Sequence, residues 1–412
     1  MKIIVVGQYY YPDNFLINEI TEELVKRGHN VTMLTGLPDY STNVVPKEYR
    51  YLKKHKEIIN GVKVIRVPII ARHKGFVFRV LNYLSFMFSS SIYVLTHSFN
   101  ADVIMAYQTA PIFMVNAAII LKKKLKKPLF LYCLDIWPDQ MKIWHVKEGN
   151  PIFSLVKKYC QFAYNKADIL GITSKPFKKY MTEINNVDKN RIVYLPQHSS
   201  RLNIEKKYTN SGEVNLVFAG NIGYQQNIEL IIKAVSKITT NKKYTIHIFG
   251  EGSNYINCIN LSKKLGVDNK IKFYGRVSKS ILDKYYSKMD AFLLTLQPES
   301  VIGFAANTLP AKFQGYLSAG KPILASIDGA AFEIINEIGC GKAVKANDLD
   351  GFAYIINDFI ENKEIYIEYG KKGKEFFDNH FEKKVIMDQL EVILKKLSHK
   401  GEDIYDKKSS FN

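Results

Sequence analysis

Residues 308–326 read "TLPAKFQGYLSAGKPILAS", and this stretch predicts one helix followed by one strand. Pro310 suits the first helical turn, where a missing N–H costs nothing, and Gly320 suits the position just past the helix end. Lys312 then lies in the first turn, where the positive end of the helix dipole disfavours a cation. Two interpretations stand: a diphosphate covers this turn and pairs with its amides and the ammonium, or the lysine extends to solvent.

The same alternation of strand and helix runs along the whole chain of 412 residues. Residues 3–7 predict a buried strand, Asp13 or Asn14 can cap the helix that follows, and residues 31–35 predict the next strand. Such a β-α-β unit starts a parallel sheet. A polar stretch at residues 197–214 has the composition of a linker, and the alternation restarts after it. The sequence therefore predicts two similar α/β halves joined near residue 200.

The chain is strongly basic, with 58 Lys and Arg against 39 Asp and Glu and a net charge of +19. This excess suits nucleic acid, an acidic membrane or phosphorylated small molecules. Basic residues gather in "RHKGFVFR" at 72–79 and "KKKLKK" at 122–127, beside apolar segments, which is typical of a membrane surface. No nucleic-acid motif accompanies them. The alternative is that the phenylalanines pack in the core and the lysines are solvated.

Residues 80–101 contain no Asp, Glu, Lys or Arg, a length that would suit a transmembrane helix. Asn, Ser, Thr and His side chains interrupt the segment, however. We therefore expect a buried or interfacial helix rather than a membrane span.

Three loops that follow predicted strands in the second half are rich in glycine. They read "AGNIGYQQNIE" at 219–229, "FGEGS" at 249–253 and "YGRVS" at 274–278. One glycine after a strand is usually a tight turn, but glycines at corresponding positions of successive loops let the backbone approach a ligand closely. Exposed N–H groups at helix starts bind phosphate. Together with residues 308–312, these loops predict a phosphate site.

These motifs, with "FYGRV" and "GAAFEIINEIGCGKAV", resemble the retaining glycosyltransferases of family 4, and within them the capsule and O-antigen enzymes of the L-fucosamine-transferring type. In the first half, "YYYPDN" and "LDIWPD" are similar to that family's acceptor domain. The resemblance implies an α/β fold of the GT-B type, with two Rossmann-like domains facing a central cleft. It implies an acceptor domain at 1–200, a nucleotide-sugar domain at 201–382, and a helix at about 383–398 that packs back on the first domain.

The chain departs from the family pattern at two glutamates with seven residues between them. Those positions hold Asn307 and Gly315, and Glu299 upstream is either a substitute or a surface residue. The family's basic pair on the diphosphate falls near Asn221 and Gln226, so Lys312 or Arg276 is expected to carry that charge. The predicted donor-binding residues are Gly220, Asn221, Gly223, Gln226, Gly250, Glu251, Arg276, Glu299, Asn307, Thr308, Leu309 and Lys312.

On the acceptor side, Asp13 and Asn14 replace the family's glycine pair, and Tyr107 falls near its cleft histidine. Asp135 in "DIWPD" is the candidate that orients the acceptor hydroxyl, with a helix cap or turn residue as the alternative. A retaining transfer chiefly needs leaving-group stabilisation, which makes Lys312 the second catalytic candidate. The predicted acceptor-binding residues are Asp13, Asn14, Tyr107 and Asp135.

The resemblance implies a UDP-sugar donor and no metal or other cofactor. The single DxD triplet, residues 348–350, precedes a predicted helix and is interpreted as a cap. We expect transfer of a sugar, an N-acetylated deoxyhexosamine, to a polyprenyl-diphosphate-linked saccharide in capsule or O-antigen synthesis. The enzyme would be cytoplasmic and peripheral on the anionic inner face of the cell membrane. The alternatives are a UDP-sugar epimerase of the same fold and a basic nucleic-acid-binding protein.

Overall fold

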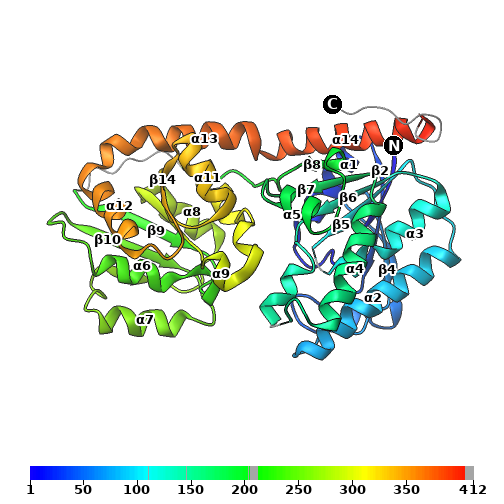
Figure 1. Ribbon diagram of the computed structural model, residues 1–412, viewed down its shortest axis with the longest axis horizontal. Coiled ribbons are helices and arrows are strands. Elements are labelled where there is room, and N and C mark those ends of the chain that lie inside the picture. Colours follow the sequence, from blue (N-terminus) through cyan, green and yellow to red (C-terminus); the bar gives the residue numbers. More distant parts are fainter. Residues whose placement is uncertain (110, 145, 203, 205–211, 404–412) are drawn as a thin grey trace. The chain divides into compact units, whose positions relative to one another are not determined.

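The computed structural model describes residues 1–109, 111–144, 146–202, 204 and 212–403 (Figure 1). The chain divides into two compact units. Unit 1 comprises Met1–Leu195 and the chain from Met387 onward, and unit 2 comprises Pro196–Ile386. Most of the predicted linker, residues 203 and 205–211, lies outside the described residues.

Unit 1 contains an eight-stranded sheet in the order β3-β4-β2-β1-β5-β6-β7-β8, parallel except for the β3–β4 pair. Its central strands are apolar and buried on both faces, as expected when helices cover both sides of a parallel sheet. The strands are β1 (Lys2–Val6), β2 (Asn30–Gly36), β3 (Lys56–Ile59), β4 (Val62–Val67), β5 (Val103–Gln108), β6 (Leu129–Cys133), β7 (Ile169–Ile172) and β8 (Ile192–Tyr194). The helices are α1 (Leu16–Lys26), α2 (Phe76–Thr96), α3 (Asn116–Leu125), α4 (Pro151–Lys166) and α5 (Phe177–Glu183).

The last helix, α14 (Lys383–Asp403), belongs to unit 1 from Met387 onward. Arg27 at the end of α1 donates to Asp388 at 2.7 Å and to Glu391 at 2.9 Å. Hydrogen bonds from Lys395 and Arg27 lower the pKa of Glu391 to about 2. Ion pairs therefore hold α14 against the C-terminal end of α1.

Unit 2 contains a six-stranded, wholly parallel sheet in the order β11-β10-β9-β12-β13-β14. This is the doubly wound order 3-2-1-4-5-6 of dinucleotide-binding folds. Its strands are β9 (Val214–Ala219), β10 (Tyr244–Phe249), β11 (Ile271–Phe273), β12 (Ala291–Thr295), β13 (Ile323–Ser326) and β14 (Gly341–Val344). Its helices are α6 (Ile228–Val235), α7 (Tyr255–Lys264), α8 (Lys279–Lys288), α9 (Glu299–Ile302), α10 (Ala311–Ser318), α11 (Gly329–Ile338), α12 (Leu349–Asn362) and α13 (Ile367–His380).

Alternate residues of β9 pack on opposite sides of this sheet. Leu216 and Phe218 lie in one apolar cluster, and Val217 and Ala219 lie in the other. Helices therefore cover both faces of the sheet in unit 2, as Figure 1 shows around β9 and β10. The predicted α/β class with two Rossmann-like units is confirmed.

The apolar segment at residues 80–101 forms most of α2, which begins earlier, at Phe76. One side of the helix is buried through Asn82, Phe86 and Ser90, so the predicted helix packs on the unit. Among the described residues, no helix combines the length and apolar character needed to cross a membrane.

Candidate functional site

The strand order of unit 2 reverses between β9 and β12, and ligands of open α/β sheets bind at the carboxyl ends of strands at such a point. The three glycine-rich loops converge there. Gly220 N donates to Phe249 O at 3.0 Å, and Gly250 N donates to Gly275 O at 2.8 Å. A Cβ on Gly250 would lie 1.8 Å from Gly220 O, and Gly250 has a φ of +128°. The loops are thus packed backbone against backbone, which only glycine permits.

Lys312 enters this site from the first turn of α10, which starts directly after Pro310. Its Nζ lies 4.2 Å from the centroid of the Phe218 ring and would be 2.9 Å from a Cβ on Gly220. The ammonium is buried without a hydrogen-bond partner, and this burial lowers the pKa of Lys312 to about 8. Lys312 therefore does not extend to solvent. It lies against the Gly220 loop and over the Phe218 ring.

The loop after β9 is also fixed to the end of β12. Thr295 Oγ1 donates to Gln226 O at 2.6 Å, and Gln297 N donates to Gln225 O at 2.9 Å. Asn221 is exposed, and its Nδ2 donates to Gln226 Oε1 at 3.4 Å. Gly223 is buried at the start of the short 3-10 turn η5 (Tyr224–Gln226). Two polar side chains of the predicted set therefore line a loop that the sheet holds in place.

Glu299 and Asn307 also meet. Asn307 Nδ2 donates to Glu299 Oε2 at 2.9 Å, so the upstream glutamate reaches one of the positions where the family pattern has a carboxylate. Thr308 follows and is partly exposed, whereas Leu309 is 9% exposed and packs in the apolar cluster around Phe313. Leu309 can therefore offer only its backbone to a ligand.

Glu251 and Arg276 are exposed on the loops after β10 and β11. The Glu251 carboxylate lies beside Gly275, with Oε1 3.5 Å from a Cβ built there. These two side chains lie at the same carboxyl edge as Gly250.

In unit 1 the predicted residues at the first loop have mainly structural contacts. Asp13 is buried and accepts hydrogen bonds from Tyr40 N at 3.1 Å and Ser41 N at 3.0 Å. The N-cap of α1 is Phe15, so neither Asp13 nor the exposed Asn14 caps that helix, and this prediction was wrong. The Asp13 carboxylate accepts from two backbone N–H groups of the loop after β2 and not from the N-terminus of α1.

Tyr107 and Asp135 differ in exposure. Tyr107 is 2% exposed on β5 and its ring packs edge-on against Tyr132, so its side chain belongs to the core. Asp135 lies in the loop after β6, where Gln108 Nε2 donates to its carbonyl at 3.0 Å. Its residue is partly exposed, and burial raises the pKa of its carboxyl to about 6. Asp135 therefore carries a carboxyl group with a raised pKa at the carboxyl edge of the sheet, as expected of a functional group.

Sequence reasoning missed a second polar group at this edge of unit 1. Arg72, which follows β4, stacks on Tyr40 with 4.7 Å from Cζ to the ring centroid. Its Nη1 donates to the hydroxyl of Tyr9 at 3.1 Å, and its backbone N donates to Asp39 at 2.8 Å. In the sequence Arg72 belongs to the basic run at 72–79, and no local signal shows that three loops meet around it. His198, within the predicted linker, is 3% exposed.

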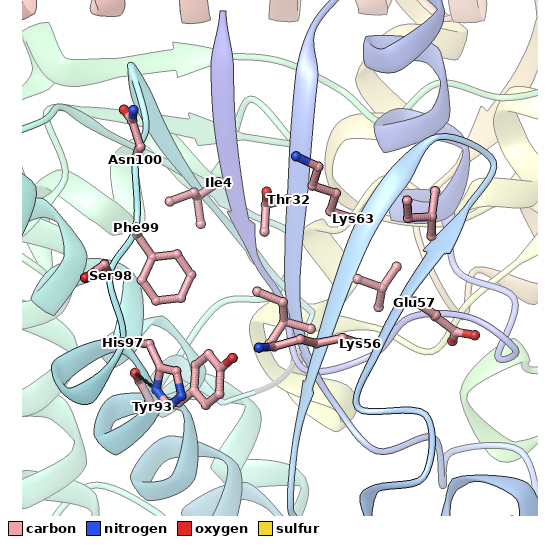
Figure 2. A pocket seen from close by; sticks show the side chains of 13 residues that line it. Ile4, Thr32, Lys56, Glu57, Lys63, Tyr93, His97, Ser98, Phe99 and Asn100 are labelled. Atoms are coloured by element: carbon pink, nitrogen blue, oxygen red, sulfur yellow. Dashed lines mark hydrogen bonds between the residues drawn. The ribbon is translucent and has the colours of Figure 1, made fainter.

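A cavity of about 550 Å³ lies elsewhere in unit 1. Figure 2 shows it between the face of the sheet at Ile4 and Thr32 and the end of α2 at Tyr93 and His97. None of the predicted site residues lines it. The predicted site residues therefore lie at the carboxyl ends of the strands and not in this cavity.

The described residues contain no group of three His, Cys, Asp or Glu side chains placed to hold a metal ion. Asp348 of the DxD triplet caps α12, its carboxylate accepting from Gly351 N at 2.9 Å. Asp350 pairs with Lys237. The predicted capping role of the triplet is confirmed.

Comparison with known proteins assigns both halves of the chain. Residues 16–198 match the model for the glycosyl transferase 4-like domain, and residues 200–376 match the model for glycosyl transferases group 1. The chain is 21% identical to N-acetyl-alpha-D-glucosaminyl L-malate synthase of Bacillus anthracis, over 91% of both proteins. It is 28% identical to lipopolysaccharide 1,6-galactosyltransferase of Escherichia coli, over 36% of this chain and 39% of that one.

Among solved structures, the chain resembles Anabaena Alr3699/HepE in complex with UDP, with a TM-score of 0.69. The sequences are 14% identical, and the match covers 96% of this chain and 100% of the other. At this identity the likeness shows the fold.

Proposed function

This chain is a glycosyltransferase of the GT-B type, with a glycosyl transferase 4-like domain followed by a group 1 domain, and on that premise we propose that it transfers a sugar from a UDP-sugar to a lipid-linked saccharide. The sugar is an N-acetylated deoxyhexosamine, and the product belongs to a capsule or O-antigen polysaccharide. The single observation that carries the proposal is the buried, unpartnered ammonium of Lys312 beside the Gly220 loop.

Lys312 supports a diphosphate leaving group. A cation held in a desolvated position stabilises developing negative charge without reorganising at the moment of reaction. As the glycosidic bond to UDP breaks, Lys312 and the amides of the first α10 turn would offset the charge on the departing diphosphate. The departing phosphate can take the proton of the acceptor hydroxyl, and Asp135 would orient that hydroxyl. The sugar would keep its anomeric configuration.

A lipid-linked acceptor suits the surface around the start of α2. Phe76, Val77 and Phe78 are 52%, 66% and 43% exposed, and exposed Lys74 precedes them. The core interpretation of these phenylalanines does not fit that exposure. In the second basic run, however, Lys122 pairs with Asp168 and Lys124 donates to three carbonyls at the end of α2. Those two lysines hold the fold together, which leaves the exposed Lys123 and Lys126 of this run for an anionic surface.

A donor screen tests the proposed reaction. Purified protein is incubated with a panel of UDP-sugars and a prenyl-diphosphate-linked saccharide, and released UDP and extracted lipid product are measured. The proposal expects UDP release that depends on acceptor, and an NMR-determined product linkage with the anomeric configuration of the donor. Conversion of a UDP-sugar without acceptor would instead identify an epimerase.

Vesicle sedimentation tests the membrane contact. Wild type should pellet with anionic vesicles and be released in part by salt, since each lysine near an anionic leaflet contributes about 1 kcal/mol. Lys74→Glu with Lys123→Glu should reduce pelleting. The matched control reverses Lys279 and Lys284, two exposed lysines of α8, and should pellet like wild type. Equal losses in both double variants would refute a defined membrane face.

A further inference from the structure

Three loops of unit 1 build a compact group of aromatic and polar side chains around Arg72. Tyr9 follows β1, Asp39 and Tyr40 follow β2, and Arg72 follows β4. Because β1, β2 and β4 are parallel, these loops leave the same carboxyl edge of the sheet. Asp135 follows β6 at that edge too. The group therefore lies at the edge where α/β sheets bind their ligands.

The guanidinium of Arg72 is held without a carboxylate. It lies 4.7 Å from the Tyr40 centroid and 5.9 Å from the Tyr9 centroid, and the Tyr9 hydroxyl accepts a single N–H. Among the described residues no Asp or Glu forms a salt bridge with it. The remaining N–H donors of its planar fork are therefore positioned for an outside acceptor, and such a fork suits a phosphate or carboxylate.

The surroundings of Arg72 fix its position. The Tyr9 ring stacks on Phe15 at 5.2 Å, and Tyr40 packs edge-on against Phe15 at 4.8 Å. Asp39 is buried and binds the Arg72 backbone N, while Asn82 of α2 donates to the same carboxylate oxygen at 2.8 Å. Arginine that stacks on rigid rings loses little freedom on binding. Tyr40 is 45% exposed, so the stack is open to solvent.

We propose that Arg72, stacked on Tyr9 and Tyr40, binds the diphosphate of the acceptor lipid. The inference rests on the proposed function for the identity of that acceptor. The chain continues from Arg72 through exposed His73 and Lys74 to the exposed apolar start of α2. A prenyl diphosphate presents an anion joined to an apolar chain, and this surface offers a guanidinium followed by apolar side chains. A small dicarboxylate would use the guanidinium and leave the apolar side chains unoccupied.

Binding without turnover tests this site. Farnesyl diphosphate is titrated calorimetrically into the full chain in the presence of saturating UDP, which occupies the diphosphate site at Lys312. Arg72→Gln should weaken farnesyl diphosphate binding about 10- to 100-fold, the effect of losing hydrogen bonds to a charged group. Arg72→Lys keeps the charge without the planar fork, so its farnesyl diphosphate affinity should lie between those of wild type and Arg72→Gln. Arg50→Gln is the matched control, because Arg50 is exposed and its side chain donates to a carbonyl, Val45 O.

An unfolding transition in urea that matches wild type, followed by circular dichroism, verifies the fold of each variant. Equal farnesyl diphosphate affinities for wild type and Arg72→Gln would overturn the proposal. So would L-malate binding as tightly as farnesyl diphosphate, since that result would assign the site to a small dicarboxylate. The readout needs no transfer, so loss of farnesyl diphosphate binding in Arg72→Gln supports the site even if the donor screen finds no sugar transfer.

Discussion

Replacing Lys312 by Met should stabilise the ligand-free protein and weaken its function at once. Burial lowers the pKa of Lys312 from 10.5 to about 8, so keeping the ammonium charged costs about 3 kcal/mol at pH 7. The folded-state pKa is the lower one, so the unfolded chain binds more protons between pH 8 and 10.5. That cost is therefore present in full below pH 8 and disappears as the pH rises through this window. Methionine removes the charge but also the contact with the Phe218 ring, so we expect a net gain of about 1–3 kcal/mol at pH 7.

Lys321 provides the matched control. Burial lowers its pKa to about 8 as well, yet its Nζ donates to the carbonyls of Tyr286, Ser287 and Met289. Lys321→Met removes the side-chain donor that these three carbonyls share and should destabilise the protein by about 1–3 kcal/mol. Urea unfolding at pH 7, followed by circular dichroism, compares the two variants.

The functional half of the prediction uses the same variants. UDP should raise the unfolding midpoint of wild type but not of Lys312→Met. The transfer rate of Lys312→Met should fall by about 10²–10³, since other charge stabilisers contribute about 2–4 kcal/mol. A Lys312→Met protein that is less stable than wild type, or that UDP still protects fully, would refute the proposal that the buried Lys312 ammonium binds the diphosphate of the donor.

Three further changes probe the same sites. Asp135→Asn should lower kcat by about 10² or more without changing UDP affinity. Because the pKa of Asp135 is raised to about 6, its carboxylate is present above that pH. The wild-type rate should therefore fall below pH 6, while the rate of the variant should not. Gly250→Ala should lower the unfolding midpoint and abolish UDP binding in thermal-shift assays, since its Cβ would lie 1.8 Å from Gly220 O, and retained UDP binding would exclude the packed-loop geometry. Transfer should persist in EDTA, and a loss that manganese or magnesium restores would contradict metal-free catalysis.

The doubly wound units could be predicted because local patterns dominate there. The strand Val214–Ala219, for example, ends in the apolar run 216–219 followed by glycine, and these signals act within a few residues. The position of Lys312 in a first helical turn was predicted in the same way. Its burial against Phe218 was not, because that contact joins residues almost a hundred positions apart.

In unit 1 as well, contacts between segments far apart in the sequence decide where the predicted residues lie. Asp13 has the residue type of a helix cap, but its carboxylate binds Tyr40 N and Ser41 N from another loop. Tyr107 aligned with a cleft position, yet it precedes the end of β5 and points into the core against Tyr132. Arg72 was assigned to a basic surface because its tyrosine partners are contributed by distant loops. Contacts between loops decide where these side chains of unit 1 lie, and a single sequence does not reveal such contacts.

Proton uptake on UDP binding tests the central claim most directly. Lys312 is about half protonated at pH 8 in the ligand-free protein, and a diphosphate beside it would raise its pKa. The phosphates of UDP are ionised at that pH, since a phosphate's second pKa is about 6. Titration calorimetry at pH 8 in buffers of different ionisation enthalpy should therefore show uptake of about half a proton by wild type and none by Lys312→Met. UDP binding without uptake in wild type, or with equal uptake in both proteins, would contradict a diphosphate site at Lys312.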